Sequence, residues 1–120
     1  MQKRADSERP FTLRKAIQLT EDVGTLIARM PEHERDVLGG EMARYSFLVV
    51  GRLSKAHDAV TAARRYRGFS AARGAVCALS SLFDIAVRVK VLTPADIERP
   101  FITCDELMHM LGDLAGSPAW

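Results

Sequence analysis

Residues 71–89 have the sequence AARGAVCALSSLFDIAVRV, and their apolar side chains recur every three or four positions. That spacing places the apolar side chains along one side of an α-helix. Small residues in the first half of the stretch suit close packing against a neighbouring helix. The stretch therefore predicts a core helix whose apolar face is formed by Ala72, Ala75, Val76, Leu79, Leu82, Phe83, Ala86 and Val89.

Two further helical patterns precede this stretch. In the first, Thr12 is expected to cap the helix with its hydroxyl, and Pro31 to end it, because the residue before a proline is pushed out of the helical region. The second runs from Pro31 to Val60, with Pro31 in its first turn. Gly39 and Gly40 weaken this helix but permit close approach of another. The two apolar faces comprise Leu13, Ala16, Ile17, Thr20, Val23, Ile27 and Met30, and then Leu38, Met42, Tyr45, Val49, Leu53, Ala56 and Val60.

A fourth helical pattern follows residues 71–89. Thr93 and Pro94 have the composition of an N-cap followed by the first helical position. Pro100 is expected to kink or split this helix, because proline lacks the N–H that the helix interior requires. Residues 61–69 are predicted to be a basic connection or the start of the third helix. The apolar face of the last helix comprises Cys104, Leu107, Met108, Leu111 and Leu114.

The four patterns together predict the fold class. No alternating pattern typical of a β-strand is present, and amphipathic helices joined by short connections pack most economically side by side. We therefore expect an all-α protein, an antiparallel up-down-up-down four-helix bundle over residues 11–115. Residues 1–10 and 116–120 are expected to be a flexible N-terminal tail and a C-terminal tail.

The composition is that of an ordinary globular domain. The chain has 120 residues, of which 48% are hydrophobic and 27% charged, which excludes wholesale disorder. No apolar run approaches the roughly 18 residues needed to span a bilayer, and no apolar signal segment is visible near Met1. Cys77 and Cys104 lack metal-binding spacing and are expected to be small core residues. These features predict a cytoplasmic protein without a membrane segment.

Basic residues are concentrated in the middle of the chain. Residues 44–90 contain nine lysines and arginines against two aspartates, a local charge of +7 in a chain whose net charge is +2. Such segregation attracts polyanions. Arginine side chains match phosphate geometry, and Tyr66 and Phe69 are placed to stack on bases. The alternative is a solvated face with intersubunit ion pairs. The predicted nucleic-acid-binding residues are Arg52, Lys55, Arg64, Arg65, Arg67 and Arg73.

Two segments resemble a known family. The first is Met30-Pro31-Glu32-His33-Glu34-Arg35-Asp36-Val37-Leu38, followed by Arg44, and the second is Ala78-Leu79-Ser80-Ser81-Leu82-Phe83-Asp84-Ile85. They are similar to segments of the bacterial four-helix-bundle proteins. That family includes proteins encoded in intervening sequences of 23S rRNA genes and the accessory variability determinant of diversity-generating retroelements.

The resemblance implies an up-down-up-down bundle that assembles as a homopentamer. It also implies binding to nucleic acid and to a partner reverse transcriptase, as for the retroelement accessory protein. A protein-interaction scaffold that recruits such a partner is therefore the alternative to direct nucleic-acid binding.

Three patterns bear on catalysis. Arg52 and His57 have a spacing that resembles the motif of HEPN ribonucleases, in which histidine acts as acid or base, but the pattern is short and common by chance. Glu106 and His109 form a single Glu-x-x-His, whereas a di-metal site needs two. Ser80 and Ser81 have no evident base nearby. We therefore expect no enzyme activity, no catalytic residue, no metal site and no cofactor.

The apolar residues of the middle helices exceed one narrow stripe. Excess apolar surface on a small domain is typical of an interface between copies of a chain. The sequence thus predicts a homo-oligomer that works by binding nucleic acid or a partner protein. The residues that lie partly outside the stripe are Val37, Phe47, Leu48, Val50 and Val87.

Overall fold

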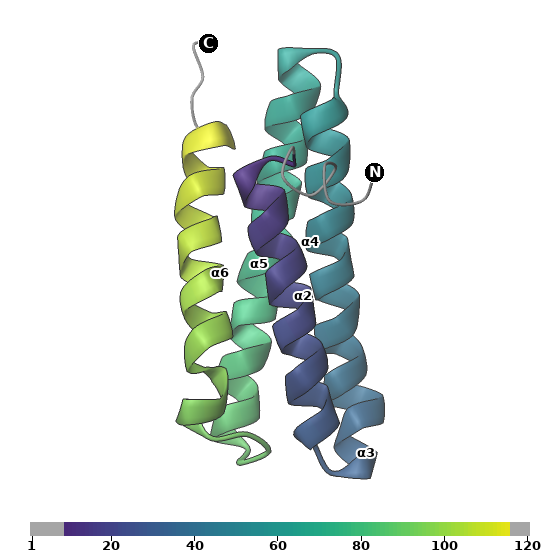
Figure 1. Cartoon of the computed structure of the whole chain (residues 1–120), viewed down its shortest axis with the longest axis vertical. Coiled ribbons are helices and arrows are strands. Elements are labelled where there is room, and N and C mark those ends of the chain that lie inside the picture. Colours follow the sequence, from purple (N-terminus) through teal and green to yellow (C-terminus); the bar gives the residue numbers. More distant parts are fainter. Residues whose placement is uncertain (1–8, 116–120) are drawn as a thin grey trace.

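A computed structural model describes residues 9–115, which are helical over most of their length and contain no strand. The all-α prediction is therefore confirmed for this part of the chain. Four long helices account for the fold, and a short helical segment with a wider π-helical turn precedes the second of them (Figure 1). The elements are α2 (Phe11–Arg29), α3 (Glu32–Glu34), η1 (Arg35–Gly39), α4 (Gly40–Asp58), α5 (Ala62–Arg88) and α6 (Pro94–Ala115).

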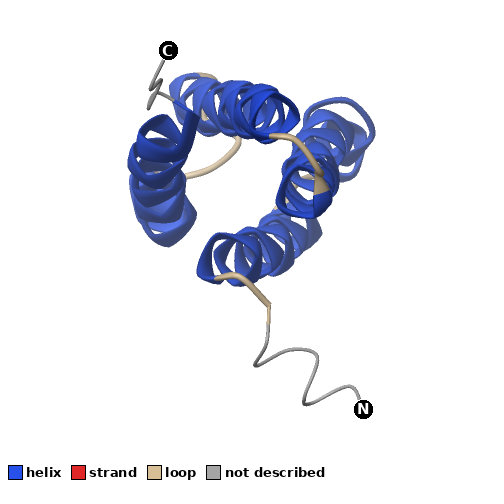
Figure 2. Ribbon diagram, turned by 90° about the horizontal axis from the view of Figure 1, so that it is seen from above, coloured by secondary structure: helices blue, strands red, loops and turns tan. Residues whose placement is uncertain are grey.

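The long helices lie side by side around one core (Figure 2). α5 contacts both α4 and α6, and α2 completes the arrangement by contacting the same two helices. The connection between α4 and α5 lies at one end of the molecule, whereas the α2–α3 and α5–α6 connections lie at the other end (Figure 1). Each long helix therefore has two neighbours and buries one side.

The core is formed largely by the residues that the helical spacing selects. On α5, the buried face includes Leu79 and Phe83, and only Leu82 and Val89 of the predicted set lie partly or fully outside the core. On α4, the prediction that Val60 belongs to the apolar face is wrong, because the helix ends at Asp58 and the Val60 side chain is 85% exposed. The largest fully buried side chains are Phe83, Leu19, Met30, Met42, Leu53, Leu79, Leu107 and Leu111.

The buried face of α2 differs from the predicted one. Leu19 and Leu26 are buried, whereas Leu13, Ile17 and Ile27 are only partly so. The buried side is therefore turned slightly about the helix axis from the expected stripe. The apolar stripe of α2 is broader than the surface that its two neighbouring helices cover. The part of the stripe that becomes buried therefore depends on how those helices pack against it.

Thr12 is not the N-cap of α2, because the helix begins at Phe11 and its capping position is Pro10. Thr12 is instead buried, with Oγ1 2.9 Å from Nε2 of His57 on α4. The His57 ring also meets Phe69 of α5 edge-to-face, with ring centroids 5.0 Å apart. Burial lowers the pKa of His57, and Asp58 opposes this shift only in part. One histidine therefore connects three helices.

The segment between α2 and α4 is not the regular start of a long helix that the sequence predicts. Pro31 is the capping residue of the short α3 rather than a first-turn residue, and a wider turn follows over η1. Gly39 lies in this turn against the end of α2, where a Cβ atom would be 3.2 Å from Cγ2 of Ile27. The expectation that the glycine pair permits a close approach is thus confirmed at Gly39.

Both remaining helix starts have side-chain caps. The hydroxyl of Thr61 accepts the backbone N–H of Arg64, so residues 62–69 are the start of α5 and not a connection. Thr93 and Asp96 form a capping box at the start of α6, in which the backbone N–H of each residue donates a hydrogen bond to the side chain of the other. The nitrogen-to-oxygen distances are 2.9 and 3.2 Å. Pro100 lies buried inside α6, which continues to Ala115 and is not split.

The two cysteines occupy different environments. Cys104 is buried in the core, as expected, and burial raises the pKa of its thiol to about 12. Cys77 is exposed on α5, so the expectation that it is a core residue is wrong. The helical face predicted for α5 already excluded Cys77, because the stripe runs through its neighbours Ala75, Val76 and Leu79.

By length and composition alone, α5 is long and apolar enough to cross a membrane, although it contains no continuous apolar run of that length. This is weak evidence for a span, because the core helix of a soluble protein meets the same criterion. Here α5 packs between α4 and α6 and contributes seven buried side chains to the common core.

Glycines 68 and 74 of α5 provide a matched test of helix packing. A Cβ atom at Gly68 would lie 2.6 Å from Cβ of Ala56 on α4, whereas a Cβ atom at Gly74 would meet nothing within 4 Å. We expect Gly68→Ala to lower the free energy of unfolding by about 1–3 kcal/mol through overpacking. Gly74→Ala should raise it by about 0.5–1 kcal/mol through helix propensity. Urea denaturation measures both; equal changes would contradict the close approach at Gly68.

The environment of His57 makes stability depend on pH. Because its pKa is lower in the folded chain than the ordinary value of about 6.5, the unfolded chain takes up the proton first as pH falls. The contribution of neutral His57 is thus complete above about pH 6.5 and is lost as pH falls through the folded pKa.

We expect His57→Gln to reduce the loss of unfolding free energy between about pH 7.5 and 5.5, measured by urea denaturation at both values. His33→Gln is the control: its side chain is 82% exposed and pairs with Glu34, so its replacement should not reduce that loss. A wild-type-like pH dependence in His57→Gln would contradict the assignment.

Candidate nucleic-acid interface

The candidate interface lies where the end of α4 meets the beginning of α5. These two helices approach closely because the facing positions are small. Gly68 lies directly against Ala56, with no space for a Cβ atom between them. Ala59 and Ala71 extend this seam of small residues in both directions. Because the side chains along the seam are small, the longer side chains on either side of it project beyond them and form the sides of a groove.

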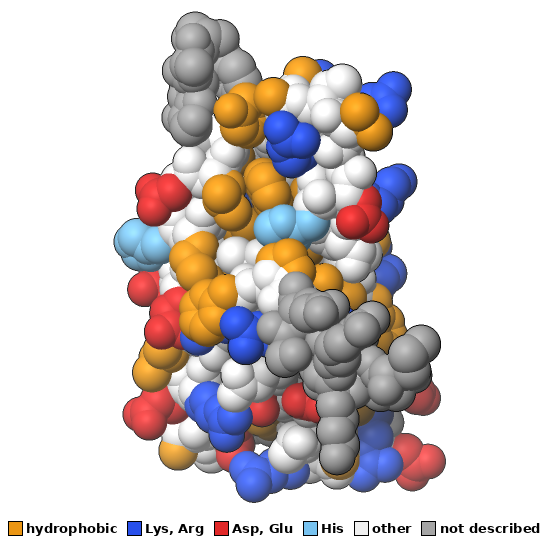
Figure 3. Space-filling view, turned by 45° about the horizontal axis from the view of Figure 1, so that its top comes forward, with side chains coloured by type: hydrophobic (Ala, Val, Ile, Leu, Met, Phe, Trp, Pro, Cys, Tyr) orange, Lys and Arg blue, Asp and Glu red, His pale blue; other side chains and the backbone are white. Residues whose placement is uncertain are grey.

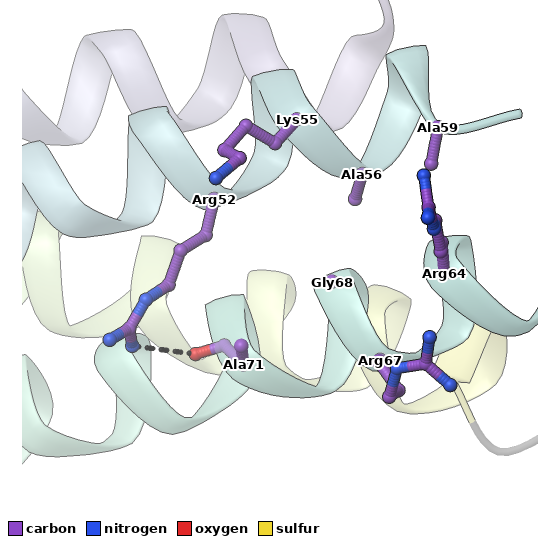
Figure 4. Close-up of a pocket in the computed structure, with 8 residues that line it drawn as sticks. All are labelled: Arg52, Lys55, Ala56, Ala59, Arg64, Arg67, Gly68 and Ala71. Carbon is purple, nitrogen blue, oxygen red and sulfur yellow. Dashed lines mark hydrogen bonds between the residues drawn. The ribbon is translucent and has the colours of Figure 1, made fainter.

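A groove of about 430 Å³ follows this seam (Figure 4). Arg52 and Lys55 of α4 line one side, and Arg64 and Arg67 of α5 line the other. The remaining lining residues form a floor of methyl groups and backbone: Ala56, Ala59, Gly68 and Ala71. The structure thus brings four of the six predicted binding residues together around one concave surface.

The four cationic residues have no carboxylate partner within residues 9–115. Nη1 of Arg52 donates to the backbone carbonyl of Ala71 across the groove at 3.0 Å, which holds the guanidinium in place without neutralising it (Figure 4). By contrast, Arg44 pairs with Glu41 and Arg88 pairs with Asp84 on the helix surface. The four cations at the groove are therefore not paired with a carboxylate of the described part of the chain.

The other two predicted residues lie outside the groove. Nη1 of Arg65 donates to the carbonyl of Ala59 at 3.0 Å, where α4 has ended, and so satisfies a backbone group at a helix terminus. Nε of Arg73 donates to the carbonyl of Met108 on α6 at 3.0 Å. Arg73 borders a separate hollow together with Asp105 and Asp113, whose carboxylates oppose an anionic ligand.

Neither aromatic residue of the basic segment lines the groove. Phe69 is only 5% exposed and packs against His57, so the expectation that it stacks on bases is wrong. Tyr66 is partly buried. The presence of an aromatic residue in a basic segment does not show whether its side chain faces the core or the solvent. The Phe69 side chain faces the core.

The Arg52 and His57 pair is not assembled at the groove. Arg52 lines it, whereas His57 turns toward Thr12 and Phe69. The Glu106 carboxylate pairs with Nζ of Lys15 at 2.6 Å. In the part of the chain that the structure describes, no three His, Cys, Asp or Glu side chains are grouped in a way that could hold a metal ion.

The floor of the groove is the part of the site that sequence reasoning missed. Ala56 was assigned to the core, and Gly68 and Ala71 were assigned no role. The available signal was the helical spacing of Arg64, Arg67, Gly68 and Ala71, at positions i, i+3, i+4 and i+7. This spacing places two small residues and two long cationic ones on one face of the helix.

No protein-family model and no curated protein matches this chain. The likeness to the four-helix-bundle family therefore stays a prediction, and any function has to be argued from the groove itself.

Proposed function

We propose that this chain is an antiparallel up-down-up-down bundle that binds nucleic acid at the α4–α5 groove and performs no catalysis. One observation carries the proposal: Arg52, Lys55, Arg64 and Arg67 converge on a concave surface without a carboxylate partner in residues 9–115. The alternation of the helix connections between the two ends of the molecule supports the topology.

The chemistry of the groove suits phosphodiesters. Guanidinium groups donate two parallel hydrogen bonds to phosphate oxygens, and lysine adds a point charge. Phosphate contacts release condensed counterions, so they supply most of the sequence-independent affinity for nucleic acid. Four cations in one groove, none paired with a carboxylate of residues 9–115, provide such contacts from a single protomer.

We further propose that the chain self-associates, with a homopentamer as the expected assembly. The supporting observation is exposed apolar surface: Val37 and Phe47 are 71% and 63% exposed, and Phe47 borders an apolar hollow with Ile17 and Val50 between α2 and α4. Hydrophobic side chains are also visible among charged ones on the face in Figure 3. Closed symmetry would repeat the groove around an axis, and repeated sites strengthen binding to a long polyanion.

Charge reversal tests the groove. We expect Arg64→Glu with Arg67→Glu to abolish retention of labelled RNA and DNA at moderate salt, because two attractive contacts become repulsive. Arg65 is left unchanged because it holds the end of α4. For the wild type, the slope of log affinity against log salt should be negative by about 0.7–0.9 per phosphate contact. Filter binding measures both.

The control is Arg88→Glu with Lys90→Glu, at and just beyond the opposite end of α5, which changes the net charge equally. Equal loss in both double variants would mean that overall charge, not the groove, governs retention. Retention of a cellular protein that survives nuclease treatment would instead favour the scaffold function, with a partner such as a reverse transcriptase.

Replacing an exposed aromatic residue tests self-association. We expect Phe47→Glu to convert the assembly to monomers without loss of helicity, because the Phe47 side chain contributes to the surface and not to the core. Size-exclusion chromatography with light scattering measures the mass, which should be that of a pentamer for the wild type. Val60→Glu, at a position 85% exposed on the α4–α5 connection, is the matched control. A monomeric wild type at micromolar concentration contradicts the proposal.

A further inference from the structure

The shape and floor of the α4–α5 groove narrow the class of ligand. We infer that the groove takes a single-stranded nucleic acid, which lies inside it with its phosphates between the two cationic walls and its bases turned outward, without sequence selection. This inference rests on the proposed function and adds the strandedness, the position and the lack of base readout.

The positions of the charges favour a single strand. Arg52 and Lys55 stand on one helix and Arg64 and Arg67 on the next, with the seam of small residues between them. A ligand that meets all four side chains has to enter the space between the helices. The phosphates of a duplex lie on the outside of a wide, stiff rod and can meet only the rims of such a groove. A single strand is flexible enough to place successive phosphates within it.

The length of the groove matches a short stretch of one strand. Arg52 bonds the carbonyl of Ala71 at one end, and Arg64 lines the other. Positions 64 and 71 of α5 are separated by about 10 Å along the helix at about 1.5 Å per residue. Charges on one nucleic-acid strand recur at about 3.4 Å along a stacked helix, and more widely when the strand is extended. The groove therefore has the length of roughly two or three phosphates of one strand.

The chemistry of the floor favours recognition of phosphates over bases. Ala56, Ala59, Gly68 and Ala71 offer no side-chain donor or acceptor to the edge of a base. No aromatic side chain of residues 9–115 lines the groove, and Phe69 is buried in the core. Reading a sequence requires hydrogen bonds to base edges, and holding bases in a single-strand groove commonly uses aromatic stacking. The floor provides neither, and the side-chain donors of the lining within residues 9–115 are the four cations that contact the phosphates in this arrangement, so the phosphates are the groups that this groove recognises.

A steric variant separates a ligand inside the groove from one lying across a charged patch. Ala71→Phe fills the floor but keeps all four cationic side chains and the carbonyl that Arg52 bonds. Because Ala71 is exposed, the fold should tolerate the change, and Ala71→Leu provides a smaller step should the phenylalanine variant lose helicity. Ser81→Phe is the matched control, at an exposed position of the same helix away from the groove.

The probes are labelled 12-nucleotide strands of oligo-dT and of two unrelated mixed sequences, and a duplex of one mixed sequence, measured by fluorescence anisotropy with the full chain. We expect the three single strands to bind alike, the duplex to bind more weakly, and Ala71→Phe to weaken single-strand binding by at least about tenfold, or 1.4 kcal/mol. Ala71→Leu should have a smaller effect in the same direction, and Ser81→Phe none.

The failures of the two proposals are distinguishable. Equal binding of Ala71→Phe and wild type, with binding still lost in the Arg64 and Arg67 double variant, would overturn the placement inside the groove while leaving the proposed function intact. Duplex binding as tight as single-strand binding, or a marked preference for one sequence, would overturn the inference in the same way. No binding of any probe by the wild type would contradict the proposed function itself.

Discussion

The contact between Gly68 and Ala56 is the constraint on which the candidate site depends. With only hydrogen at position 68, the backbone of α5 comes against a methyl group of α4, and no larger side chain fits between them. This approach brings the long side chains that flank the seam toward one another, so that cations from two helices share one concave surface. A wider separation of the helices would leave the same residues as two independent solvated faces.

Arginine has two separate functions in this chain, and the backbone distinguishes them. Arg35, Arg65 and Arg73 donate to carbonyl oxygens of neighbouring segments, where they satisfy acceptors near helix ends or fasten one helix to the next. Arg64 and Arg67 make no such bond within the described residues, and their charge faces the groove. Arg52 does both. A count of basic residues cannot distinguish the arginines that bond the backbone from those that face the groove, because the difference depends on which carbonyl oxygen lies within reach of each side chain.

Much of the fold follows from the sequence, and the parts that do not have physical reasons. The spacing of Leu79 and Phe83 defines the buried face of α5, and the composition of Thr93 and Pro94 correctly predicts the start of α6. The π-helical turn before Gly40 was not predicted; Gly39 within it lies against the end of α2, a contact that helical spacing does not reveal. Thr12 is a residue type that often caps helices, but its hydroxyl interacts with His57, a residue 45 positions away in the sequence.

The candidate site was predicted in composition but not in shape. Its cations are visible in the sequence as a charge excess, whereas the division of six residues into four at the groove and two elsewhere requires the helices to be placed. The floor was missed because alanine and glycine carry no chemical signal of their own. Their role lies in the space that they leave, which becomes apparent only when the facing helix is known.

The contrast between the two thiols has a practical consequence. Cys104 is buried and its pKa is raised to about 12, so it stays protonated and sheltered from reagents, whereas Cys77 stands on the outer surface of α5. A maleimide dye should therefore attach at one position per chain without any engineered substitution. That position lies about 15 Å along the same helix from Arg67, estimated from the helical rise. The protein thus carries a natural attachment point for a fluorescent reporter within energy-transfer range of whatever occupies the groove.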